Sequence, residues 1–146
     1  MRKLSFAWFA GFGFVASAFV MADGVPTTVT YVPHGSGEAF VNGRQVLGDK
    51  GLVVLANRRG AGEVEVHEKT NHVLIIMEGE ATFVTGGTLV EPRQTAPGQT
   101  RAKEVRGGTT YHLSKGDVIT VPAKTPHWFK DVSTGTIAYY AINFEP

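Results

Sequence analysis

Apolar residues along most of the chain either alternate with polar ones or form short runs between turn residues. Residues 63–67 (EVEVH) alternate strictly, which indicates a half-buried strand. The strand expected at 73–79 begins with five consecutive apolar residues at 73–77 (VLIIM), which predicts a central strand covered on both faces. Further strands are expected at 28–32, 38–41, 51–59, 79–87, 109–113, 116–122, 127–132 and 136–144. No segment after residue 22 keeps a helical period over ten residues. The pattern predicts an all-β antiparallel sandwich or barrel.

Composition supports a single globular domain with many tight turns. The 146 residues include 18 Gly and 7 Pro, which suits short strands joined by turns. Charged residues make up 18% and hydrophobic residues 42%, as in ordinary folded proteins. Because we find no strong repeat and no linker, one domain is expected.

The N-terminal segment is patterned differently from the rest. Two basic residues precede an apolar stretch at 6–20, and small residues end at Ala22, which is the layout of a secretory signal peptide. The alternative is an uncleaved anchor helix, but the apolar stretch is shorter than the roughly 20 residues that a span requires. We therefore predict a signal peptide at 1–22, a mature domain at 23–146, and no stable membrane anchor after processing.

Charge and cysteine content narrow the location and the partners. The chain has no Cys, so it can form no disulfide, and export without disulfides favours a periplasmic or secreted bacterial protein. Removal of residues 1–22 lowers Lys plus Arg from 14 to 12 against 13 Asp plus Glu, a net charge of −1. No basic stripe remains, so nucleic acid is not an expected partner.

Three histidines are candidates for a metal site. His67 and His72 are five residues apart, so they would be about 140° apart on a helix and on opposite faces of one straight strand. They can converge only if the chain turns at 68–71 (EKTN). His127 opens a later strand, after a loop framed by two prolines. Three converging imidazoles would suit a divalent transition metal with open positions, whereas separate ones would be ordinary polar residues at strand ends.

The segment around the first two histidines resembles the first motif of the cupin superfamily. That motif runs Gly, five residues, His-x-His, three or four residues, Glu, six residues, Gly. Aligned on His67 as the first His, Lys69 stands at the second His, His72 at the Glu and Gly79 at the last Gly. Gly62 is one residue closer to His67 than the motif has it.

The second cupin motif resembles residues 116–131. It runs Gly, five residues, Pro-x-Gly, two residues, His, three residues, Asn. Gly116, Pro122 and His127 match at the expected spacing. Lys124 replaces the Gly and Asp131 replaces the Asn.

The resemblance implies a single small jelly-roll β-barrel, the cupin-type double-stranded β-helix, with a metal inside it. It implies His67, His72 and His127 as ligands of a divalent transition metal such as Fe, Mn, Zn, Ni or Cu, and it implies a homodimer. Lys69 would then orient or protonate an acidic substrate, or it would be a solvated residue of the turn.

Several pocket-wall residues follow from strand parity. Phe129 should face the same side as His127, and one of Tyr139 and Tyr140 should face the interior. The polar segment at 91–108 could cap the barrel mouth and favour an anionic substrate. We expect instead a solvated excursion or an arm that covers a neighbouring subunit.

Three classes of function remain open. The leading hypothesis is a metal-dependent enzyme on a small molecule (a dioxygenase, isomerase or lyase), with oxygen chemistry favoured. The alternative is a non-catalytic module that binds or senses a small molecule. The third is a structural protein whose edge strands pair with another chain.

Overall fold

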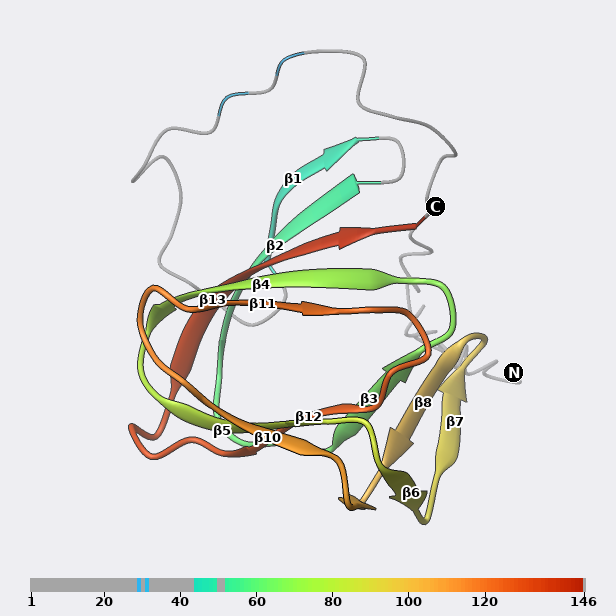
Figure 1. The fold of residues 1–146 in the computed structure, drawn as a ribbon. Helices are drawn as coiled ribbons and strands as arrows, with labels where there is room; N and C mark the ends of the chain where they lie inside the picture. Colours follow the sequence, from blue (N-terminus) through green and yellow to red (C-terminus); the bar gives the residue numbers. More distant parts are fainter. Residues whose placement is uncertain (1–28, 30, 32–43, 50–51, 146) are drawn as a thin grey trace, which may run out of the picture.

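The structure is a computed structural model that describes residues 29, 31, 44–49 and 52–145. These residues form strands and connecting loops, and two antiparallel sheets face each other (Figure 1). The predicted boundary after residue 22 lies outside the described residues, as do the strands expected at 28–32 and 38–41, apart from Val29 and Tyr31, which belong to no strand. Within the described residues, no helix has the length and apolar character needed to cross a membrane.

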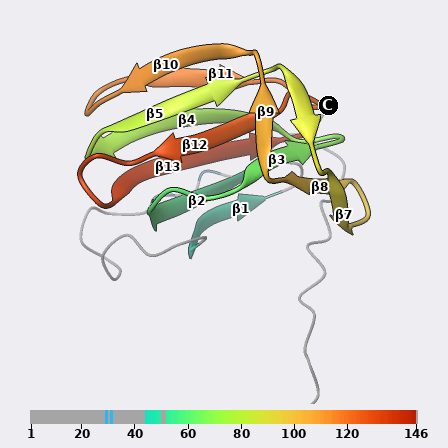
Figure 2. The ribbon, with the colours of Figure 1, turned by 90° about the horizontal axis from the view of Figure 1, so that it is seen from below.

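The two sheets interleave segments that are distant in the sequence. One sheet has the order β1 (Arg44–Asp49), β2 (Leu52–Arg59), β13 (Ile137–Phe144), β4 (Asn71–Glu78), β11 (Val118–Val121). The other has the order β10 (Thr109–Leu113), β5 (Ala81–Thr85), β12 (His127–Asp131), β3 (Val64–His67), β8 (Gln99–Ala102), β7 (Arg93–Ala96). A ribbon of β6 (Thr88–Val90) and β9 (Glu104–Arg106) crosses one end (Figure 2). Such crossed antiparallel connections produce the predicted jelly roll.

The core fills one end of the space between the sheets. Alternate residues of β4 and β5 point inward, and the largest fully buried side chains include Phe83 and Ile76. The prediction that residues 73–77 are covered on both faces is wrong. Burial in β4 alternates, with His72, Leu74 and Ile76 buried and the residues between them half-buried, because one face of the strand points into the sandwich.

Two connections position the candidate site. β3 ends at His67 and β4 begins at Asn71, so the chain turns between the two histidines, as predicted. At this turn the chain also passes from one sheet to the other. The segment at 91–108 contains β7, β8 and β9. Its interpretation as a solvated excursion is wrong for β8, because β8 pairs along its whole length with β3 and thereby becomes part of the barrel wall.

Candidate metal centre

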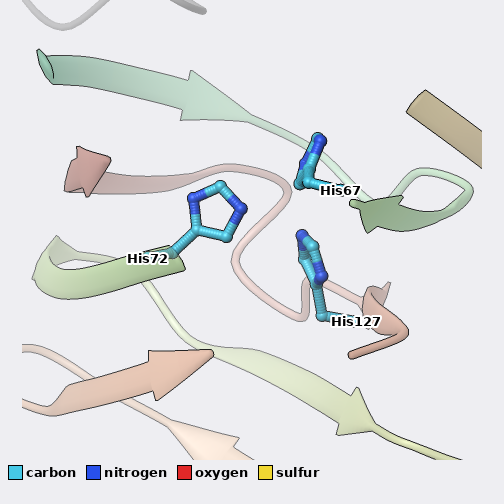
Figure 3. Close-up of side chains that lie close together, drawn as sticks. All are labelled: His67, His72 and His127. Atoms are coloured by element: carbon cyan, nitrogen blue, oxygen red, sulfur yellow. The ribbon is translucent and has the colours of Figure 1, made fainter. Parts of the chain in front are cut away.

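Three strands bring His67, His72 and His127 together. His67 ends β3, His72 is the second residue of β4, and His127 begins β12, and their rings point toward one another (Figure 3). One ring nitrogen from each lies within 4.8 Å of the others, and the ring centroids are 4.8 to 5.2 Å apart. His72 and His127 are buried, and His67 is half-buried. The structure thus brings together the three histidines singled out from the sequence.

Each imidazole is held by a hydrogen bond at Nδ1. His72 Nδ1 lies 2.7 Å from Asn143 Oδ1, and His127 Nδ1 lies 3.0 Å from the Thr125 carbonyl oxygen. His67 Nδ1 bonds Gln99 Oε1. Because all three partners are oxygen acceptors, each Nδ1 carries the proton and donates it. Each Nε2 therefore keeps a free lone pair, the arrangement found in metal-ligating histidines.

The buried nitrogens fit a metal ion. Among the described residues, His72 Nε2 is buried without a hydrogen-bond partner, which is costly unless something else uses its lone pair. Burial lowers the pKa of His127 to about 4 and also lowers that of His72, so both rings are neutral near pH 7. Neutral imidazole is the form that binds a metal. The three clustered nitrogens could therefore hold a divalent transition metal.

The loop before β12 holds this geometry together. Lys124 has a φ of 64°, a left-handed conformation that L side chains rarely adopt. Its backbone N–H donates to the His67 carbonyl oxygen at 2.7 Å, and the Ala123 N–H donates to Asn71 Oδ1 at 3.1 Å. The positive φ explains why the cupin motif has Gly at the position of Lys124. The loop thus ties the start of β12 to the β3–β4 turn.

The histidines line a cavity of about 750 Å³ between the sheets. Arg59, Glu65, Arg101 and Phe129 line the same cavity. Tyr139 lines it as well, and burial raises the pKa of its hydroxyl to about 12. Phe129 therefore faces the side of His127, as predicted.

An ionic cluster of Arg59, Glu65 and Arg101 borders the histidines. Arg59 Nη1 donates to Glu65 Oε1 at 2.8 Å, and Arg101 Nη1 lies 3.4 Å from Glu65 Oε2. The same Oε2 is 3.6 Å from His67 Nε2, longer than a hydrogen bond. Burial alone would raise the pKa of Glu65, but the hydrogen bond from Arg59 and the charges of Arg59 and Arg101 outweigh it and hold that pKa well below its usual range. Glu65 is therefore ionised.

The structure places Lys69 outside the cavity. β3 ends before it, and Lys69 is an exposed residue of the turn that does not line the cavity. The inward neighbour of His67 is Glu65, two residues earlier on the same strand face. The first cupin motif therefore aligns with Glu65-x-His67, which leaves four residues before His72 and six more before Gly79.

Sequence reasoning missed the residues that surround the histidines. Five of them are polar and either line the cavity or hold an imidazole: Arg59, Glu65, Gln99, Arg101 and Asn143. For Glu65 a signal was present, because an alignment on Lys69 leaves only two residues before His72 where the motif has three or four. Gln99 and Arg101 lie in the segment at 91–108, for which a cap that favours an anionic substrate was one interpretation and a solvated excursion the preferred one. No local pattern singled out these two residues as facing the site.

Comparison with known proteins agrees with the fold and the motifs. The family described as Cupin matches residues 47–145. The chain belongs to the cupin family. A search of curated proteins finds no match.

Three solved structures illustrate the likeness of this cupin to others. A Bacillus halodurans protein is 18% identical with a TM-score of 0.58, covering 87% of each chain. A Ralstonia eutropha protein, provisionally described as a mannose-6-phosphate isomerase, is 16% identical with a TM-score of 0.50 over 70% of this chain and 82% of that one. The hydroxypropylphosphonic acid epoxidase of S. wedmorenis is 22% identical with a TM-score of 0.46, over 65% of this chain and 44% of the epoxidase. The first two likenesses show the fold.

Proposed function

We propose that this cupin is a metal-dependent enzyme that acts on a small organic molecule inside the barrel. His67, His72 and His127 would hold the ion through Nε2. One observation supports this proposal above the others: all three Nδ1 atoms are committed to oxygen acceptors, and the three opposite nitrogens converge with no protein partner for His72 Nε2. A purely structural histidine cluster would use both ring nitrogens.

A divalent ion bound there would supply Lewis acidity to a substrate oxygen or, if redox-active, would permit oxygen chemistry, which we favour. The chain's own residues have separate tasks. Gln99, Asn143 and the Thr125 carbonyl orient the imidazoles and fix their tautomer. Phe129 and Tyr139 form an aromatic wall, with ring centroids 5.1 Å apart, that limits water beside the histidines.

Elemental analysis of residues 23–146, purified without a His-tag, tests the proposal. We expect near-stoichiometric metal in the parent and its loss in the His67→Ala/His127→Ala double variant. His112→Ala is the matched control, because His112 is an exposed histidine outside the cavity. Iron would support oxygen activation, and zinc or manganese would support Lewis-acid chemistry. A parent that binds no metal even after reconstitution would refute the proposal.

The alternative is a non-catalytic module that binds or senses a small molecule. One observation favours it: two groups of the cavity wall that could transfer protons, Glu65 and Tyr139, each stay in one protonation state near pH 7. Glu65 is ionised between two arginines, and burial raises the pKa of Tyr139 to about 12. A protein that retains a ligand after purification and needs no metal to do so would favour this alternative.

We further propose that the protein is exported to the periplasm after cleavage behind Ala22 and forms a homodimer. N-terminal sequencing of the secreted protein tests cleavage, and light scattering of residues 23–146 tests the dimer. A mature chain that still begins at Met1, or a monomeric mass, would refute the corresponding proposal.

A further inference from the structure

Beside the histidines, two arginines of the cavity wall share one carboxylate. These are Arg59 and Arg101, which both contact Glu65. Glu63, at the mouth, adds no net charge, because both of its oxygens accept hydrogen bonds from Arg93 at 2.8 and 2.7 Å. Glu145, the other acidic residue of the lining, accepts a hydrogen bond from Thr70 Oγ1 at 3.0 Å. Beside the histidines, two partly desolvated guanidinium groups therefore share the single carboxylate of Glu65, and a desolvated cation is costly unless it is fully paired.

The two arginines differ in how many of their guanidinium groups' interactions are made within the protein. Arg59 makes a hydrogen bond to Glu65 and lies over the Phe129 ring at 5.8 Å. Arg101 is held only by an ion pair at 3.4 Å, and its Nη1 is buried without a hydrogen-bond acceptor among the described residues. Arg101 also lines the cavity and keeps 28% of its side-chain surface exposed. Arg101 is thus the arginine whose guanidinium N–H groups are less fully used in hydrogen bonds.

Arg101 also lies close to the three histidines. Glu65 Oε2 is 3.4 Å from Arg101 Nη1 and 3.6 Å from His67 Nε2, so the separation of those two nitrogens cannot exceed the combined length of these contacts. A short carbon chain spans such a separation. A ligand that contacts Arg101 can therefore place a second functional group at the open nitrogens of the histidines.

We propose that Arg101, supported by Arg59 and Glu65, forms a carboxylate-binding subsite, and that the ligand is a short organic acid. Its carboxylate accepts hydrogen bonds from the Arg101 guanidinium, and a second oxygen of the same molecule lies toward the three histidines. Glu65 keeps the guanidiniums in place and prevents them from binding a second anion. The inference rests on the proposed function only for that second oxygen, because the carboxylate contact needs no metal.

The test is titration calorimetry at low ionic strength with malonate and succinate as probes, on metal-free and zinc-loaded protein. Malonamide, which has the shape of malonate without its charges, is the neutral control. We expect both acids to bind the metal-free protein and to bind the zinc-loaded protein more tightly. Malonamide should bind at least about tenfold more weakly than malonate, because hydrogen bonds to charged groups are stronger than neutral ones.

Three variants assign the binding to Arg101. Arg101→Gln should weaken malonate binding to metal-free protein by about tenfold or more, and Arg101→Lys should restore part of it, since Lys keeps the charge but offers no fork of donors. Arg106→Gln is the matched control, because it removes the same charge from the same segment at an exposed position outside the cavity. Circular dichroism of each variant verifies that it is folded.

The outcomes separate this inference from the metal proposal. Weak binding in Arg101→Gln with unchanged binding in Arg106→Gln supports the subsite, even if the protein retains no zinc. Absence of binding by both acids in both forms, equal losses in Arg101→Gln and Arg106→Gln, or equal binding of malonamide would each overturn the subsite and would leave the metal measurement untouched. If Arg101→Gln does not fold, the comparison of Arg101→Lys with Arg106→Gln decides.

Discussion

The interior of the sandwich has two ends, a polar cavity and an apolar core, and the same strands build both. Along the inward face of β4, His72 at the cavity is followed by Leu74 and then Ile76 in the core. On neighbouring β13, Asn143 pairs with His72 and Ala141 with Leu74. The backbone pairing is continuous across both ends, so only the choice of side chains separates a site from a core.

The comparison shows how differently the two ends are stabilised. In the core, burial of hydrocarbon is favourable in itself, and Phe83 packs against Phe129 with ring centroids 4.7 Å apart. At the cavity end, every buried polar group costs free energy unless it has a partner. His72 Nδ1 has a hydrogen-bond partner in Asn143, but His72 Nε2 has none among the described residues. A ligand or metal that contacts Nε2 should therefore stabilise the cavity end.

The largest expected effect is a loss of folding stability caused by a substitution at the core end. Phe83→Ala should lower the free energy of unfolding by about 3–5 kcal/mol, because it removes a fully buried aromatic ring and leaves a cavity. Urea denaturation measures this. Tyr111→Ala is the control, since Tyr111 lies opposite Phe83 on β10 but is exposed, and it should cost at most about 1 kcal/mol. Similar losses in both variants would contradict the position of the core.

A smaller effect should come from acid at the cavity end. The pKa of His127 is about 4 in the folded protein and 6.5 ordinarily, so between those values the unfolded state binds more protons. Stability is therefore full above pH 6.5 and is lost as pH falls toward 4, and metal-free protein should lose about 2 kcal/mol between pH 7 and pH 5. The lowered pKa of His72 acts in the same direction. Urea denaturation at both pH values measures the loss.

Two variants sharpen the acid prediction. His127→Gln should reduce the pH dependence, because a glutamine cannot bind the proton, and the contribution of His72 should remain. His112→Gln should leave it unchanged, because His112 is exposed and its side chain lies 3.8 Å from Glu80 at the surface. Equal stability of the parent at pH 7 and pH 5 would mean that the buried imidazoles do not resist protonation.

An effect of similar size is expected at the residue that holds His67. Gln99→Ala removes the acceptor of the His67 Nδ1 hydrogen bond and should weaken zinc affinity by about 10- to 100-fold. Competition with a chromogenic chelator measures the affinity. Gln94→Ala is the matched control, because Gln94 is an exposed glutamine of the neighbouring strand β7 and does not line the cavity. Unchanged affinity in Gln99→Ala would show that His67 needs no support from β8.

Sequence patterns by themselves were enough to predict the fold class and to identify the three histidines as candidate metal ligands. Period-2 alternation and frequent turn residues are local properties of strands, so they predict a β-sandwich without any knowledge of the pairing. The same local logic required a bend between His67 and His72, since neither a helix nor one strand brings them together. The bend and the convergence on His127 are present in the structure.

Only the tertiary structure decided which other residues surround the site. The end of β3 at His67 excluded Lys69 from the wall and placed Glu65 beside the histidines. The pairing of β8 with β3 brought Gln99 to His67 and Arg101 to Glu65, across more than thirty residues of sequence. Side-chain alternation can be read from neighbouring residues, but the register between distant strands depends on the packing of the whole sandwich, which no short stretch of sequence contains.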